Sequence, residues 1–183
     1  MKLETVKLGH CPLCGKDRGL RRLFDLDTFG VFQCACGMKF IDPCLSAGAM
    51  MELYRSSEAL SEINPALVQY YEYDTSNPRT KTYRDYLRAL EELSKAVAGR
   101  EMLEVGCGQG AFLKAARKSE WKTAGLDSAP ENIAALEREG IEGICADFLS
   151  YSGSRQFDAV VLWDLIEHPQ SPAEFIRKAR ALL

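Results

Sequence analysis

Apolar runs and amphipathic stretches alternate along the chain from residue 100 onward. Short apolar runs predict four strands, at 101–106, 122–127, 142–147 and 157–164. Stretches whose apolar positions recur every three or four residues predict three helices, at 110–119, 129–140 and 171–183. Strict alternation of strands and helices is typical of an α/β fold, in which a parallel sheet carries helices on its faces.

The middle of the chain, residues 45–99, has a helical pattern. The clearest helix has Pro78 near its start and Gly99 near its end. Its predicted buried face consists of Tyr83, Tyr86, Leu87, Leu90, Leu93 and Val97. Two shorter helices are predicted at 46–57 and 65–74. We interpret this part of the chain as a helical linker or cap.

Residues 1–44 have little helical periodicity and are rich in Cys and Gly. Two short β-like runs, at 30–34 and 38–43, indicate a small module with two hairpin-like turns. The sequence therefore predicts three parts, which are residues 1–44, 45–99 and 100–183.

Composition narrows the class of protein. Of the 183 residues, 46% are hydrophobic and 27% are charged, which is typical of a globular protein. The net charge of -3 argues against a broad nucleic-acid surface, although Arg18, Arg21 and Arg22 give the first part a slight basic excess. The sequence has no apolar run near the ~20 residues that a membrane-spanning helix needs, and residues 1–10 lack the apolar core of a signal peptide. We therefore expect a cytoplasmic protein with no membrane partner.

Four of the seven cysteines stand in two close pairs, Cys11 with Cys14 and Cys34 with Cys36. A glycine follows each pair, and two such turns can direct four thiolates at one tetrahedral Zn²⁺ ion. The metal would be structural, because four thiolates leave no position open for water and a small module needs the stability. Free buried thiols are the alternative, and a reducing compartment disfavours disulfides. Two of the three remaining cysteines, Cys107 and Cys145, are predicted to be small fillers beside the sheet.

A glycine-rich loop follows the first strand of the alternating part. It consists of Gly106, Cys107, Gly108, Gln109 and Gly110. Its G-x-G-x-G spacing is neither the G-x-G-x-x-G of dinucleotide folds nor the phosphate loop of nucleoside triphosphatases. Glu104, at the end of the strand, would repel phosphate and would suit a ligand with an ammonium or sulfonium group.

The segment LEVGCGQGAFL resembles motif I of the class I S-adenosylmethionine-dependent methyltransferases, and the segments after it agree in order and interval. The resemblance implies a Rossmann-like sheet with S-adenosylmethionine as its cofactor. In this part of the chain the implied cofactor-binding residues are Glu104, Gly106, Cys107, Gly108 and Gly110.

The same resemblance assigns roles to residues after the later strands. Asp127, with Ser128 beside it, would accept hydrogen bonds from the ribose hydroxyls. Asp147 would face the exocyclic amine of adenine, and Phe148 would lie against the ring. The remaining residues along the cofactor would be Trp163 and Asp164.

The N-terminal part has a likeness of its own. The text CPLCG…CACGMKFIDP resembles the zinc-ribbon head of many bacterial class I methyltransferases, some of which act on sugars and other small metabolites. That head commonly has C-x-x-C as its second pair, whereas Cys34 and Cys36 stand one residue closer. Cys44 and His10 are spare ligands that could replace one of the four.

Few side chains can serve as the base for methyl transfer. His168 follows the fourth strand, at the edge of the sheet where ligands bind, and is the candidate general base. A structural role is the alternative, because the resemblance implies that the pair Glu167-His168 recurs in enzymes with unrelated substrates. The tyrosines Tyr70, Tyr71 and Tyr73 could line an acceptor pocket or pack under the first helix of the alternating part.

The sequence ends in the helix after the fourth strand, whereas the class I fold normally continues for three more strands. Four strands in the order 3-2-1-4 would leave the run at 157–164 as an exposed apolar edge, which folded proteins avoid. We therefore expect a shortened chain or a homodimer that pairs this edge.

Together these features predict a methyltransferase with a zinc module that acts on a small-molecule or sugar-type acceptor. The alternatives are an rRNA methyltransferase and a non-catalytic fragment that binds the cofactor or a partner.

Overall fold

The computed structural model describes residues 3–55, 77 and 79–183. Contacts between residues divide the chain into two compact units. The first unit contains residues 1–72 and 167–174, and the second contains residues 73–166 and 175–183. The cysteine pairs lie in the first unit and the predicted parallel sheet lies in the second.

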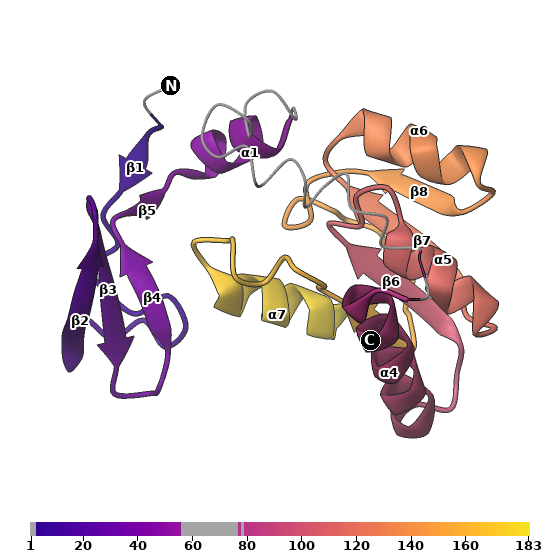
Figure 1. Ribbon diagram of the computed structural model, residues 1–183, viewed down its shortest axis with the longest axis horizontal. Helices are drawn as coiled ribbons and strands as arrows, with labels where there is room; N and C mark the ends of the chain where they lie inside the picture. The colour runs from indigo at the N-terminus through magenta and orange to yellow at the C-terminus, as the bar shows by residue number, and fades with distance from the viewer. Residues whose placement is uncertain (1–2, 56–76, 78) are drawn as a thin grey trace. The chain divides into compact units, whose positions relative to one another are not determined.

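Small antiparallel sheets form the first unit (Figure 1). A three-stranded sheet has the order β2-β3-β4, and a two-stranded sheet pairs β1 with β5. These strands are β1 Thr5–Val6, β2 Leu20–Leu26, β3 Phe29–Cys34, β4 Lys39–Asp42 and β5 Cys44–Leu45. The two predicted β-like runs correspond to β3 and β4. The sequence does not predict β2, because a register shift between Arg22 and Phe24 breaks the alternation of its side chains.

Helix α1, Ala47–Arg55, follows β5 and agrees with the helix predicted at 46–57. Ser46 caps its N-terminus. The Ser46 Oγ atom accepts a hydrogen bond from the N–H of Ala49 at 3.1 Å and donates one to Glu4 Oε2 at 2.7 Å. A serine at this position satisfies a backbone donor that has no partner inside the helix.

The second unit contains a four-stranded parallel sheet in the order β8-β7-β6-β9. Its strands are β6 Glu101–Val105, β7 Lys122–Asp127, β8 Glu142–Cys145 and β9 Ala159–Val161. This is the predicted order 3-2-1-4, and the predicted α/β fold class is confirmed. Because the strands are parallel, their carboxyl ends meet at one edge of the sheet.

Helices cover both faces of this sheet. They are α4 Lys81–Ala96, α5 Ala111–Lys118, α6 Pro130–Arg138 and α7 Pro172–Ala181. Alternate residues of β6 point to opposite faces, so Met102 packs with α4, α5 and α6, whereas Leu103 packs with Ala179 of α7. The central strand is therefore buried on both sides.

Two details of the predicted elements are wrong. Leu87 is 42% exposed, so the fully buried face of α4 consists of Tyr83, Tyr86 and Leu90. The run predicted as a strand at 157–164 pairs only through β9, because the chain turns from residue 163 onward. The helix predicted at 65–74 lies outside the described residues.

None of the helices in the described ranges combines the length and the hydrophobicity needed to cross a membrane. In the same ranges β9 has a strand partner on one side only. A homodimer that pairs this edge stays a prediction.

Candidate cofactor and metal sites

The glycine loop joins β6 to α5 at the carboxyl edge of the parallel sheet (Figure 1). Gly106, Gly108 and Gly110 have φ angles of +68°, +50° and +72°, in the left-handed region that glycine adopts without strain. The N–H of Gly106 donates to the carbonyl of Leu126 at 2.7 Å, and the N–H of Gly110 donates to the carbonyl of Cys107 at 2.9 Å. These bonds tie the loop to β7 and turn it into α5.

The three glycines differ in what surrounds them. A Cβ atom at Gly110 would lie 2.2 Å from Leu136 Cδ2, and a Cβ atom at Gly106 would lie 3.0 Å from Leu165 Cδ1. A Cβ atom at Gly108 would meet no described atom within 4 Å. The space beside Gly108 is therefore open, and a ligand can approach the backbone there.

Sequence reasoning missed two residues that pack beside the glycine loop, Leu136 and Gly125. Leu136 of α6 is fully buried, and its Cδ1 atom would lie 2.5 Å from a Cβ atom at Gly125. Leu136 thus fills the space between Gly110 and Gly125. The signal was a glycine inside the predicted strand at 122–127, because such a glycine often marks a close approach.

Asp127 ends β7, next to the glycine loop. Its carboxylate accepts the N–H of Gly108 through Oδ2 and the N–H of Ala129 through Oδ1, both at 2.9 Å. The side chain is only 9% exposed, so these two bonds hold it in one orientation. Each oxygen retains a further acceptor site for a donor such as a hydroxyl group.

Glu104 belongs to β6 and is 4% exposed. Its Oε2 atom has no hydrogen-bond partner in the described part of the chain. Burial raises the pKa of the Glu104 carboxyl well above its usual range, and the negative charges of Asp127 and Asp164 raise it further. An acid in this state is unusual for a residue whose only role is packing.

Two cysteines predicted as fillers have different environments. Cys107 is 7% exposed, and its Sγ atom would lie 2.7 Å from a Cβ atom at Gly125. Burial, followed by the charges of Glu104 and Asp127, raises the pKa of its thiol. Cys107 is therefore a neutral packing residue as predicted, whereas Cys145 is exposed and the prediction for it is wrong.

The predicted cofactor-binding residues after β7 and β8 include both exposed and buried side chains. Asp147 is exposed and accepts the N–H of Ser150 at 2.9 Å. Ser128, after β7, is exposed as well. Phe148 is only 3% exposed, and its ring packs against Phe175 at a centroid distance of 5.3 Å. The expectation that this ring lies against adenine is therefore corrected, because the ring belongs to the core on the α7 face.

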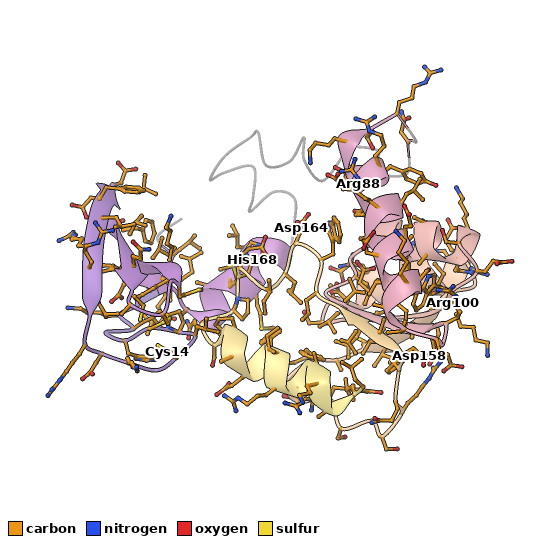
Figure 2. The ribbon with its side chains drawn as sticks, turned by 90° about the horizontal axis from the view of Figure 1, so that it is seen from below. Cys14, Arg88, Arg100, Asp158, Asp164 and His168 are labelled. Carbon is orange, nitrogen blue, oxygen red and sulfur yellow. The ribbon has the colours of Figure 1, made fainter. Side chains whose placement is uncertain are left out.

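Trp163 and Asp164 follow β9. The Trp163 ring stacks on Phe112 at 5.5 Å and meets the edge of Tyr86 at 5.0 Å, so it is part of the aromatic packing between the sheet and α4. Asp164 is exposed. Figure 2 shows Asp158 and Asp164 at opposite ends of β9, which places Asp164 at the same edge of the sheet as the glycine loop.

His168 lies in the segment 167–174, which belongs to the first unit according to its residue contacts. In that unit the side-chain amide of Gln170 donates to the carbonyl of Leu45 at 2.8 Å. The role of His168 as a general base stays a prediction. The three tyrosines Tyr70, Tyr71 and Tyr73 lie outside the described residues.

The four N-terminal cysteines come together in the first unit. Their Sγ atoms all lie within 4.8 Å of one another, with 3.7 Å between Cys11 and Cys36 and 3.6 Å between Cys14 and Cys34. A tetrahedral ion with Zn–S bonds of about 2.3 Å requires sulfur–sulfur distances of about 3.8 Å, whereas a disulfide requires about 2.05 Å. The geometry fits a four-thiolate metal site, and all four cysteines are free.

Two glycine turns explain how the short second pair still supplies two ligands. The N–H of Gly15 donates to the carbonyl of Cys11, and the N–H of Gly37 donates to the carbonyl of Cys34, both at 2.9 Å. The second turn closes one residue earlier than the first. The tighter turn compensates for the missing residue between Cys34 and Cys36.

The thiols of this cluster differ in acidity. A backbone hydrogen bond from Lys16 lowers the pKa of Cys14 to about 7. The backbone N–H of Cys36 lowers the pKa of Cys34, but burial and the neighbouring thiols outweigh it and raise that pKa to about 12. Four thiols at these distances cannot all ionise without a cation between them.

The two spare ligands are engaged elsewhere. The Cys44 thiol donates to the carbonyl of Val6 at 3.7 Å, and His10 Nδ1 bonds to the carbonyl of Leu8 at 2.6 Å. Neither joins the cluster of four sulfurs.

A parallel sheet with a glycine loop after its first strand and an acid at the end of its second defines an α/β cofactor-binding domain of the class I methyltransferase type. Residues 59–183 match the model of a family described as a methyltransferase domain. The match covers more than half of the chain, and the chain belongs to this family.

Curated relatives agree with this assignment. The ubiquinone biosynthesis O-methyltransferase of Bordetella avium (strain 197N) is 27% identical over 105 residues, which cover 53% of this chain and 44% of the relative. The enzyme of the same name from Psychrobacter cryohalolentis is 26% identical over 136 residues, which cover 68% of this chain and 50% of the relative. The chain thus spans about half the length of the curated relatives it matches.

Solved structures show the same fold. The S-adenosylmethionine-bound CalS10 from Micromonospora echinaspora, an amino pentose methyltransferase, is 24% identical with a TM-score of 0.51, covering 62% of this chain and 50% of that chain. The plantazolicin methyltransferase BpumL, in complex with a triazolic desmethylPZN analog and SAH, is 20% identical with a TM-score of 0.52, covering 75% and 57%.

Proposed function

We propose that this chain binds S-adenosylmethionine and that the protein transfers its methyl group to a small-molecule or sugar-type acceptor. The observation that carries the proposal is the open backbone at Gly108 beside the fixed carboxylate of Asp127. The family match over residues 59–183 supports it. When bound, the cofactor supplies an electrophilic methyl group on a sulfonium centre.

The residues at the carboxyl edge of the sheet suit different parts of this cofactor. Asp127 has acceptor sites left for ribose hydroxyls. Asp147 is exposed and can accept from the exocyclic amine of adenine. Glu104 is acidic and has an unsatisfied oxygen, which suits a cationic group. Phe148 has no part in this proposal, because its ring is buried in the core.

Calorimetric titration of the purified chain with S-adenosylmethionine and S-adenosylhomocysteine tests the cofactor site. We expect a dissociation constant on the order of micromolar for the wild type. The substitution Asp127→Asn should weaken binding by about 10- to 100-fold, because hydrogen bonds to a charged acceptor contribute about 1.5–3 kcal/mol. Glu137→Gln, an exposed site on α6, is the matched control and should bind like the wild type. A folded wild-type chain that binds neither compound would contradict the proposal.

The acceptor class rests on the curated relatives. Those described above are ubiquinone biosynthesis O-methyltransferases, which favours methylation of an oxygen on a small molecule. A screen of hydroxylated small molecules and sugars with labelled cofactor tests this point. Cofactor binding with no methyl transfer to any acceptor class would favour the non-catalytic alternative.

We propose His168 as the general base that removes the acceptor proton. General-base catalysis contributes about 10²- to 10⁴-fold to a rate, so His168→Gln should lower turnover by that factor and leave cofactor affinity unchanged. Turnover that is unchanged across the pH profile would assign His168 a structural role instead.

We propose that the four clustered cysteines hold one structural Zn²⁺ ion. The sulfur–sulfur distances and the cysteines' freedom from disulfides support this assignment. Elemental analysis of the purified chain should find about one zinc ion per chain. A metal-free chain with a folded first unit would overturn it.

The rRNA alternative has weaker support. Of the basic residues that favour it, Arg22 is paired with Asp25, and Arg21 donates to Gln33 at 2.8 Å. Binding of structured RNA that weakens steeply with salt would favour this alternative, and the acidic net charge of -3 predicts that such binding is absent.

A further inference from the structure

Three carboxyl groups gather at the carboxyl edge of the parallel sheet. Asp127 ends β7, Asp164 follows β9, and Glu104 lies on β6 between them. In the strand register Glu104 stands opposite Gly125 of β7 and Val161 of β9. Glu104 is therefore the central member and experiences negative charge from both neighbouring strands.

Among the described residues, the elements packed around Glu104 supply no cation to its carboxyl group. On the sheet face that it shares with Met102, α4 buries Tyr83 and Tyr86, and the buried side chains of α5 and α6 are all apolar. The glycine loop adds the neutral thiol of Cys107.

The ion pairs among the described residues do not involve Glu104. The sequence of the undescribed stretch 56–76 contains no Lys, Arg or His. Within the described residues no cation therefore compensates Glu104, and a cationic ligand would supply one.

The state of Glu104 without a ligand follows from its surroundings. An ionised carboxylate that is buried and has an unpaired oxygen is costly, and the usual response is to keep a proton. Burial and the charges of Asp127 and Asp164 raise the pKa of Glu104 in the same direction. The surroundings of Glu104 thus favour the protonated, neutral form of its carboxyl group.

We propose that Glu104 releases its proton when a cationic ligand occupies the cofactor site, so that the affinity for the cofactor rises with pH. This inference rests on the proposed function. The charge balance is simple: a neutral carboxyl meets an ammonium or sulfonium group, the carboxylate pairs with that cation, and one proton passes to the buffer. Affinity should then increase by up to about tenfold per pH unit while the free protein is protonated and the complex is not.

Calorimetry in two buffers of different ionisation enthalpy measures the released proton directly. The titration with S-adenosylmethionine is made near pH 6.5, below the α-amino pKa of about 7.7–8.0, so that the ligand keeps its own proton. The wild type should release close to one proton per bound ligand. Glu104→Gln keeps the shape of the side chain without an ionisable group, and it should release close to none, with an affinity independent of pH. Glu137→Gln should behave like the wild type.

Infrared spectroscopy gives a second readout, because it observes the protonated carboxyl group itself. The free wild-type chain should show the carbonyl band of a protonated carboxylic acid, and this band should disappear when S-adenosylmethionine is added. The band should be absent from the Glu104→Gln chain, which separates Glu104 from Asp127 and Asp164.

The outcomes separate this inference from the function on which it rests. Binding with no released proton and no acid band would overturn the role of Glu104 and leave the cofactor site intact. An acid band that persists in the complex would overturn it as well. A folded chain that binds no cofactor would overturn the proposed function and this inference with it.

Discussion

A methyl group added at Gly110 should destabilise the second unit strongly. The residue has a φ angle of +72°, and the left-handed region costs alanine about 1–2 kcal/mol. The new Cβ atom would also lie 2.2 Å from Leu136 Cδ2. Leu136 is fully buried, and its other methyl group lies against Gly125, so it has no space into which to move. Overpacking of this kind costs about 1–3 kcal/mol, which gives about 2–5 kcal/mol in total for Gly110→Ala.

Two other glycines separate the backbone strain from the clash. Gly108 and Gly140 have φ angles of +50° and +67°, and a Cβ atom at either would meet no described atom within 4 Å. Alanine at either position should therefore cost only about 1–2 kcal/mol of backbone strain. Gly108→Ala should in addition weaken cofactor binding, because its Cβ atom would enter the open space beside the loop. Gly140→Ala, at the far end of α6, should not.

Urea unfolding with linear extrapolation measures the three free energies of unfolding, and calorimetry measures the binding. The reasoning about packing is refuted if Gly110→Ala is no less stable than Gly140→Ala. If Gly108→Ala binds the cofactor as tightly as Gly140→Ala does, a ligand does not approach the backbone at Gly108.

Three further outcomes are expected. Cys14→Ser should lower the zinc content of the purified chain, whereas Cys44→Ser should leave it unchanged, because Cys44 lies outside the cluster; equal zinc content in both would argue against the site. Asp147→Asn should weaken cofactor binding less than Asp127→Asn does, because Asp147 is exposed and held by one hydrogen bond, and calorimetry that ranks the two in the opposite order would contradict this. Between about pH 4.3, the unfolded value of a glutamate, and the raised folded pKa of Glu104, this carboxyl holds its proton more in the folded chain than in the unfolded chain, so the contribution of Glu104 to stability should fall as pH rises. Thermal unfolding over a pH series should show this slope in the wild type and a flatter one in Glu104→Gln.

The parallel sheet was predictable because periodicity is a local property, whereas its strand order was implied by the resemblance to the class I methyltransferases. Each strand and helix of the second unit has enough apolar positions to indicate its type, and short connections leave few topologies. The errors lie where tertiary contacts decide. Leu87 has the correct spacing for the buried face of α4 but is 42% exposed, because spacing alone does not fix how wide the contact with the sheet is. The bulge between Arg22 and Phe24 prevented the prediction of β2, because it breaks the alternation of side chains along the strand.

The same distinction between local sequence signals and tertiary contacts applies to the candidate site. The cysteine cluster was predictable because each turn and its glycine are encoded within a few residues. The position of Asp127 at a strand end was predictable as well, because it follows from the strand itself. The orientation of Phe148 was not, because its ring packs against Phe175, which comes 27 residues later in the sequence. The orientation of Phe148 therefore depends on a packing partner, Phe175, that the local sequence does not reveal.

The glycine loop shows why a motif alone does not assign roles. In the sequence Gly106, Gly108 and Gly110 are equivalent members of G-x-G-x-G, and all three have positive φ angles. Packing distinguishes them, because Leu165 and Leu136 occupy the space beside the outer two and leave the middle one open. Gly110 is thus required by the protein's own packing, whereas Gly108, apart from its positive φ angle, is required only if a ligand binds there. The same motif therefore predicts two different phenotypes, loss of stability at Gly110 and loss of binding at Gly108.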